Sequence, residues 1–199
     1  MHTALRYVRA PGAWAAIALA VCIAFVADSV AHASKAGQPH GGKVSADDKY
    51  SLQVPNGLAF SDFRGYEDWQ VVAVSQTDDL LKVEVANPVM IAAYRAGVPG
   101  NGKPFPDGSK IAKIEWKPKK STESPFSVRI PESLQDIFLI EKDEKRFPKT
   151  SGWGYAVFDY NPTSDKFTPN AKTGVVNCGY ACHTIVAKKD YIFTGYATR

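Results

Sequence analysis

Two thiols and an imidazole lie together near the C-terminus, in a spacing that could carry chemistry. Residues 178–183 read CGYACH, so three residues separate the cysteines and a histidine directly follows the second one. Covalent attachment of a c-type haem needs two thiols for thioether bonds and an adjacent histidine that reaches the iron. The usual spacer has two residues, but a longer one can bulge without moving the histidine. The spacing therefore predicts one haem c bound through Cys178 and Cys182, with His183 as the iron ligand.

Three other uses of these side chains remain open from the sequence. An i, i+4 disulfide is possible in an oxidising compartment if the backbone brings the two Cα atoms within range. A zinc site would need a fourth ligand, which His40 or a carboxylate could supply. The two cysteines could also be reduced and purely structural.

A haem bound by His183 would have few candidates for a second strong axial ligand. His40 lies in a Gly-rich segment, and Met90 lies in a predicted helix where core packing is the commoner use of methionine. Lysines are charged at neutral pH unless they are desolvated. We therefore expect an iron that is five-coordinate or weakly capped by water. An open position favours binding or transforming a small molecule over simple electron transfer.

The first 33 residues have the pattern of a secretory signal. Arg6 and Arg9 precede an apolar run over 13–27, and an Ala-His-Ala cleavage site ends at residue 33. The run is shorter than the roughly 20 apolar residues of a membrane span, although an uncleaved anchor is an alternative. We expect export to a periplasm, no membrane association after cleavage, a flexible lead-in over 34–57 and a haem-binding domain over 58–199.

The composition is that of a globular protein. Of the 199 residues, 45% are hydrophobic and 22% charged, which excludes a disordered chain, and the net charge of +4 comes without a basic stripe or nucleic-acid motif. We therefore expect no nucleic-acid partner. Alternating apolar residues and turn signals predict an α+β fold, with a small antiparallel sheet, a few helices and the haem near the C-terminus. The expected strands are 69–75, 80–86, 110–116, 126–130, 137–141 and 153–160; the expected helices are 88–97 and 178–189, with a polar loop over 161–177 and an extended piece over 191–196.

Several motifs together resemble the cytochrome P-460 family. They are WGYAVF at 153–158, the CGYACH segment, KDYIFT at 189–194 and, upstream, FPDGS at 105–109 followed by an alternating strand. The resemblance runs from about residue 60 to the C-terminus. It implies a small, largely antiparallel β domain with helices, which is often a homodimer and carries one haem c in the periplasm.

The resemblance also implies roles for residues outside the haem motif. Members of this family join a lysine covalently to the haem edge, and Lys113 matches its position after the F-x-D-G turn, with Lys110 and Lys117 as competitors. Hydroxylamine-oxidising members place a carboxylate over the iron, whereas the related cytochromes c prime beta line the pocket with phenylalanine and bind nitric oxide. The corresponding position here falls near Phe138, and Asp136 shares its face if the strand is regular.

These features lead to three expectations about function. The first is redox chemistry on small nitrogen compounds, the oxidation of hydroxylamine or nitric oxide, with Asp136 as a proton relay and a soluble electron-transfer partner. The second is binding or scavenging of nitric oxide without turnover, which Phe138 favours. The third is an electron-transfer cytochrome.

Overall fold

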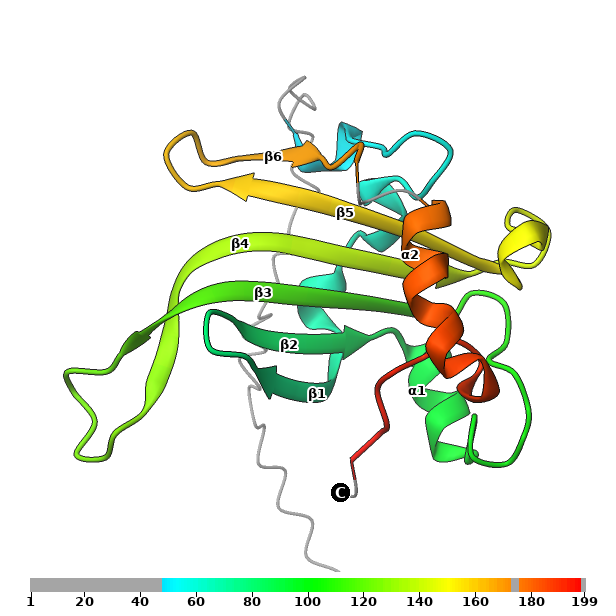
Figure 1. Ribbon diagram of the computed structural model, residues 1–199, viewed down its shortest axis with the longest axis horizontal. Helices are drawn as coiled ribbons and strands as arrows, with labels where there is room; N and C mark the ends of the chain where they lie inside the picture. The colour runs from blue at the N-terminus through cyan, green and yellow to red at the C-terminus, as the bar shows by residue number, and fades with distance from the viewer. Residues whose placement is uncertain (1–47, 173–175, 198–199) are drawn as a thin grey trace, which may run out of the picture. The chain divides into compact units, whose positions relative to one another are not determined.

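The computed structural model describes residues 48–172 and 176–197, which belong to the unit Gly42–Arg199. Its centre is a six-stranded antiparallel sheet in which each strand pairs with the next one along the chain, in the order β1-β2-β3-β4-β5-β6 (Figure 1). The strands are β1 (Gln70–Gln76), β2 (Leu81–Ala86), β3 (Lys110–Lys120), β4 (Arg129–Lys142), β5 (Trp153–Asn161) and β6 (Lys166–Pro169). The helices are α1 (Pro88–Arg95) and α2 (Val176–His183), and short 3-10 helices cover Lys49–Ser51, Phe60–Phe63, Tyr66–Asp68, Pro148–Thr150 and Thr184–Lys189. The predicted α+β architecture with an antiparallel sheet is therefore the one observed.

The two faces of the sheet bury different sets of side chains, because successive residues of a strand point to opposite sides. One face packs against the segment that precedes β1, and together they form an apolar core. The opposite face is covered by α1, α2 and the last residues of the described chain, as Figure 1 shows for α2, which lies across one end of β4 and β5. The first core includes Val54, Leu58, Phe60, Phe63, Val85, Ala112, Ile137, Leu139, Ala156 and Phe158.

Local sequence signals explain α1 and the hairpin before it. Asn87 caps α1 by accepting a hydrogen bond from the Met90 backbone N–H at 3.1 Å, and Pro88 occupies the first turn. Met90 is fully buried, which confirms its expected role in core packing. The hairpin predicted from 69–75 and 80–86 corresponds to β1 and β2.

The structure differs from the sequence-based expectations in several places. The flexible lead-in expected over 34–57 is wrong for residues 48–57, because Val54 is fully buried and belongs to the domain core. Residues 34–47 and the signal segment lie outside the described residues. Of the strand expected over 126–130, only the last two residues are in a strand, because β4 starts at Arg129 and Phe126 is exposed in the loop before it. The expected polar loop after β5 contains β6, which pairs with the edge of β5.

The helix expected over 178–189 is also divided. The α-helical part ends at His183, and a 3-10 helix continues to Lys189 before the chain turns at Asp190. No helix among the described residues is long and apolar enough to cross a membrane.

Candidate haem site

A cavity of about 500 Å³ lies between α2 and the covered face of the sheet. The sheet supplies apolar walls from Ile111, Phe138 and Val157, and the C-terminal segment closes the cavity with Ile192 and Phe193. This size and this mostly apolar lining are typical of pockets that bind an organic cofactor. All three residues of the cysteine–histidine motif line it as well.

His183 is held in a fixed orientation inside this cavity. Its ring lies 4.9 Å from the ring of Tyr155 and 4.9 Å from that of Phe193, measured between centroids. The Nδ1 atom lies 2.5 Å from the backbone carbonyl oxygen of Tyr191. A carbonyl can only accept, so Nδ1 carries the proton and the lone pair of the neutral ring is on Nε2. Burial lowers the pKa of His183, the nearby Lys113 charge acts in the same direction, and the Tyr191 carbonyl opposes both.

The two cysteines lie on the same side of α2, because residues four apart in an α-helix share a face. Cys178 is half-buried, Cys182 is exposed, and both thiols are free in the structure. The helix is continuous from Val176 to His183, so one regular turn, and not a bulge, accommodates the three-residue spacer. A helical turn thus brings both sulfur atoms and the imidazole to one cavity.

Gly179 allows α2 to approach the sheet closely. A Cβ atom at this position would lie 2.5 Å from Cγ and 2.6 Å from Cβ of Tyr155, which is closer than any real side-chain contact. Tyr155 is itself buried on β5 and forms part of the cavity wall. Only glycine fits here, so the residue between the two cysteines determines how near their helix lies to the sheet.

Lys113 and Phe138 face the cavity as a cross-strand pair of β3 and β4. The Lys113 ammonium group lies 3.8 Å from the centre of the Phe138 ring and 2.8 Å from Oε1 of Glu115. The competing lysines do not line the cavity: Lys110 donates to the Asp62 carbonyl at 2.6 Å and pairs with Glu141, and Lys117 is exposed. Of these three lysines, Lys113 is the one that lines the cavity.

Asp136 shares the face of Phe138, as the alternation of a regular strand predicts, but it lies beyond the cavity lining. Its direct cross-strand partners are Glu115 on β3 and Asp159 on β5. Burial, helped by the charges of these two carboxylates, raises the pKa of Asp136 to about 6, although Lys113 acts in the opposite direction. Its Oδ1 atom is buried and has no hydrogen-bond partner among the described residues.

Two residues of the candidate site were not anticipated from the sequence. Glu84 lines the cavity opposite Lys113, its cross-strand partner, and accepts a hydrogen bond from the Thr194 hydroxyl group. Tyr191 contributes its backbone carbonyl to His183. Strand alternation in 80–86 was visible, but the register that places Glu84 beside Lys113 was not. Every residue has a backbone carbonyl, so the amino-acid sequence does not indicate which carbonyl contacts His183.

The comparison with known families agrees with this geometry. The family model for cytochrome P460 matches residues 63–194, about two thirds of the chain. The chain belongs to the cytochrome P460 family. It is therefore a cytochrome that binds haem and its iron, as the resemblance of its motifs had indicated. No curated protein matches the chain.

The residues present fit the haem that membership of the cytochrome P460 family implies. The cavity is largely apolar, and the imidazole that enters it is held as the Nδ1–H tautomer, which is the form that binds iron through Nε2. Cys178 and Cys182 lie at the same cavity as free thiols. Within residues 48–172 and 176–197, no group of three or more His, Cys, Asp or Glu side chains is arranged to hold a metal ion directly. His40, the alternative ligand, lies outside the described residues.

The raised pKa of Asp136 predicts a pH-dependent gain of stability in the Asp136→Asn variant. The folded state of this cytochrome P460 holds the Asp136 proton more tightly than the unfolded state, so ionisation of Asp136 lowers stability as pH rises from about 4 to about 6. Asparagine has no such ionisation. We expect the variant to be more stable by on the order of 1 kcal/mol at pH 7.5, after allowance for solvent screening of a half-exposed group.

Urea denaturation at pH 3.5 and pH 7.5 measures this effect directly. The two proteins should have the same free energy of unfolding at the lower pH and differ at the higher one. An equal difference at both pH values would show that the substitution acts through packing or hydrogen bonding and not through the carboxylate charge.

Proposed function

We propose that this cytochrome P460 is an exported periplasmic protein that carries one haem c and oxidises a small nitrogen compound at an open iron position. In this proposal Cys178 and Cys182 form the thioether bonds and His183 binds the iron. Hydroxylamine or nitric oxide is the substrate, and a soluble partner receives the electrons. The predicted signal over residues 1–33 supports export.

The observation that carries the proposal is the ligand content of the cavity. Among the described residues that line it, His183 is the sole imidazole and there is no methionine; Met90 is fully buried in a core instead. A second strong axial ligand is what an electron carrier uses, so its absence from this lining favours exchange of a small ligand. Haem supplies the redox-active iron, and the chain supplies the apolar walls that exclude water and the groups that accept protons.

Proton removal is the part of the reaction that the protein's own side chains perform. Oxidation of hydroxylamine releases N–H and O–H protons together with electrons. A base whose pKa lies near the working pH accelerates such steps. Asp136 has a pKa of about 6 and lies next to Phe138 on the sheet face, with Glu115 directly across from it. We propose that Asp136 accepts the protons that leave the cavity and passes them to solvent.

Stopped-flow mixing of the ferric protein with hydroxylamine and an electron acceptor tests this function. Wild-type protein should reduce the acceptor, and Asp136→Asn should lower the rate by about a hundredfold. Glu141→Gln is the matched control: Glu141 lies on the same strand as Asp136, but its side chain faces the opposite side of the sheet, where it pairs with Lys110 at 3.1 Å. Purification of a colourless exported protein would refute the haem proposal, and full turnover in Asp136→Asn would refute the proton relay.

One observation favours the second function, binding of nitric oxide without turnover. Phe138 lines the cavity, while the Asp136 carboxylate lies outside the lining. The Phe138 ring provides room for a diatomic ligand but cannot accept substrate protons, and the carboxylate that does line the cavity, Glu84, already accepts a hydrogen bond from the Thr194 hydroxyl group. In the same experiment, tight binding of nitric oxide with no reduction of the acceptor by hydroxylamine would select this function over oxidation.

We also propose that Lys113 forms a covalent bond with the haem edge. Its side chain faces the cavity, and the neighbouring lysine Lys110 points to the other side of the sheet. Bond formation would remove one hydrogen from Nζ and one from the ring, so it requires a two-electron oxidant such as a peroxide.

The cross-link predicts a spectral change in Lys113→Arg. The ferrous Soret band of the wild-type protein should be red-shifted, and the variant should show the band of an ordinary haem c. Proteolysis should yield a haem bound to a second peptide only in the wild type. Lys110→Arg is the matched control on the same strand. Identical spectra for the wild type and Lys113→Arg would contradict the cross-link.

A further inference from the structure

The turn after the 3-10 helix Thr184–Lys189 has a strained backbone. Asp190 and Tyr191 have φ values of +49° and +63°, so two successive residues other than glycine occupy the left-handed region. Such conformations are unfavourable for L-residues and persist where the surroundings hold them in place. Contacts of both residues with the rest of the domain hold this turn in place.

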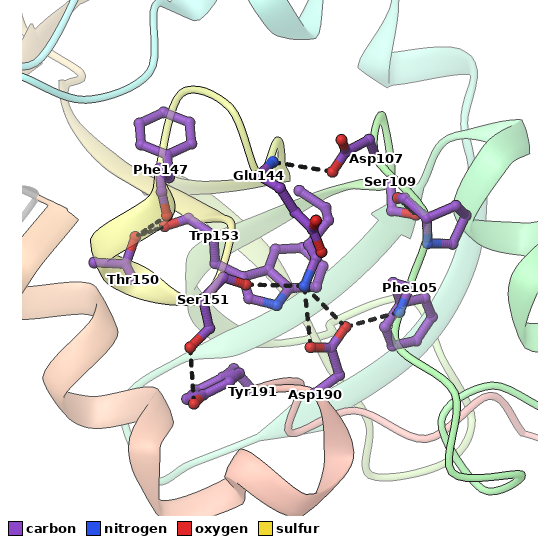
Figure 2. A network of polar contacts seen from close by, with 12 residues as sticks. Phe105, Asp107, Ser109, Glu144, Phe147, Thr150, Ser151, Trp153, Asp190 and Tyr191 are labelled. Atoms are coloured by element: carbon purple, nitrogen blue, oxygen red, sulfur yellow. Dashed lines mark hydrogen bonds and ion pairs between the residues drawn. The ribbon is translucent and has the colours of Figure 1, made fainter.

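A buried ion pair holds the first residue of the turn. The Asp190 carboxylate accepts the backbone N–H of Phe105 at 2.7 Å and pairs with the ammonium group of Lys142 at 3.2 Å. The Lys142 side chain is only 3% exposed and that of Asp190 12% exposed. Lys142 also donates to the Ser151 carbonyl at 2.9 Å, so β4, the loop before β3 and the loop before β5 converge on this pair (Figure 2).

The second residue of the turn links this ion pair to the imidazole. The Ser151 hydroxyl group donates to the Tyr191 hydroxyl at 2.9 Å, as Figure 2 shows. Ser151 therefore contacts both Tyr191, through its side chain, and Lys142, through its backbone carbonyl. The Tyr191 carbonyl in turn accepts the Nδ1–H of His183 at 2.5 Å. Displacement of the turn would therefore move the acceptor on which the orientation of His183 depends.

We infer that Lys142 and Asp190 are positioning residues that fix the Tyr191 carbonyl against His183 and thereby set the donor strength of the iron ligand. The inference rests on the proposed role of His183. A histidine whose Nδ1–H is held by a good acceptor is a stronger donor to a metal and stabilises the oxidised ion. Loss of the ion pair should loosen the turn, weaken this hydrogen bond and raise the reduction potential.

Two variants test the inference without relying on one that does not fold. Asp190→Asn keeps an acceptor for the Phe105 N–H, and asparagine tolerates positive φ, so the change isolates the charge. It also leaves Lys142 buried without its partner, which is destabilising. The double variant Lys142→Met, Asp190→Asn removes both charges and avoids that penalty.

The matched control is Glu141→Gln. This residue forms a half-buried ion pair with Lys110 at 3.1 Å on the opposite face of the same sheet, and the pair has no contact with His183. Glu141 also pairs with Arg146 at 3.2 Å, so this variant reports what the loss of buried charge pairing does to stability alone.

The readouts are the reduction potential of the holoprotein and hydrogen exchange of the His183 Nδ1–H, which NMR follows with or without haem. We expect the double variant to shift the ferric–ferrous equilibrium roughly tenfold toward the ferrous form, a rise of about 59 mV for one electron. We also expect Nδ1–H exchange to accelerate about tenfold or more. Glu141→Gln should change neither quantity.

The outcomes separate this inference from the proposed function. If the double variant keeps the wild-type potential and Nδ1–H protection and loses only stability, as the control does, the ion pair is merely structural and the inference is overturned. If the wild-type protein carries no haem, the proposed function fails. Nδ1–H exchange then still decides whether the ion pair positions His183.

Discussion

The double variant Cys178→Ser, Cys182→Ser is expected to lose the covalently attached haem. Both thiols line the cavity from one side of α2, and sulfur is the atom that forms the thioether bonds. Serine is nearly isosteric with cysteine, so the helix and His183 should stay in place and any remaining haem should be extractable. Haem staining after denaturing electrophoresis, together with the mass of the polypeptide, measures the loss.

Two further variants make this result specific. Cys22→Ser removes the third thiol of the chain, within the predicted signal segment, and should leave haem content unchanged. If the double variant retains a covalent haem, the addition of Lys113→Arg should release it, since Lys113 is the other proposed attachment point. Covalent haem in the triple variant would contradict both attachment assignments.

Much of the fold follows from local patterns. Asn87 and Pro88 mark the start of α1, β-branched runs identify β1 and β2, and alternation identifies the start of β3 before any pairing is known. β6 was not predicted because it is only four residues long and is ordered by its pairing with β5. The burial of Val54 was not predicted because its neighbours in sequence are mostly polar, and the core that covers it is formed by residues far along the chain.

The site was predictable to the extent that it depends on residue types. The motif identified Cys178, Cys182 and His183, and alternation placed Lys113 and Phe138 on faces that the antiparallel register then joins. What remained hidden are features that arise from register and backbone. The position of Asp136 beyond the cavity depends on where α2 crosses the sheet. The acceptor for His183 is a carbonyl whose direction depends on two left-handed residues.

Gly179→Ala is the substitution with the largest expected effect on the protein fold around the haem. Helix propensity alone would favour alanine by about 1 kcal/mol. Against this, the new methyl group would lie 2.5 Å and 2.6 Å from Cγ and Cβ of Tyr155, atoms close to the backbone of a buried strand residue that cannot move aside. We expect the steric conflict to prevail, with a net destabilisation of about 2 kcal/mol and a Tm lower by roughly 5 °C.

The same displacement should also reduce haem incorporation, because α2 carries both cysteines and His183 and would move away from β5. Calorimetry and the haem-to-protein ratio measure the two effects together. Gly195→Ala is the matched control, since a Cβ at Gly195 has no atom within 4 Å and should leave both quantities unchanged. A Gly179→Ala variant that gains stability and retains its full haem content would mean that α2 lies farther from the sheet than this geometry requires. The position of the cysteines and His183 over the cavity would then depend on the turn at Asp190 and Tyr191 rather than on close packing of the helix against Tyr155.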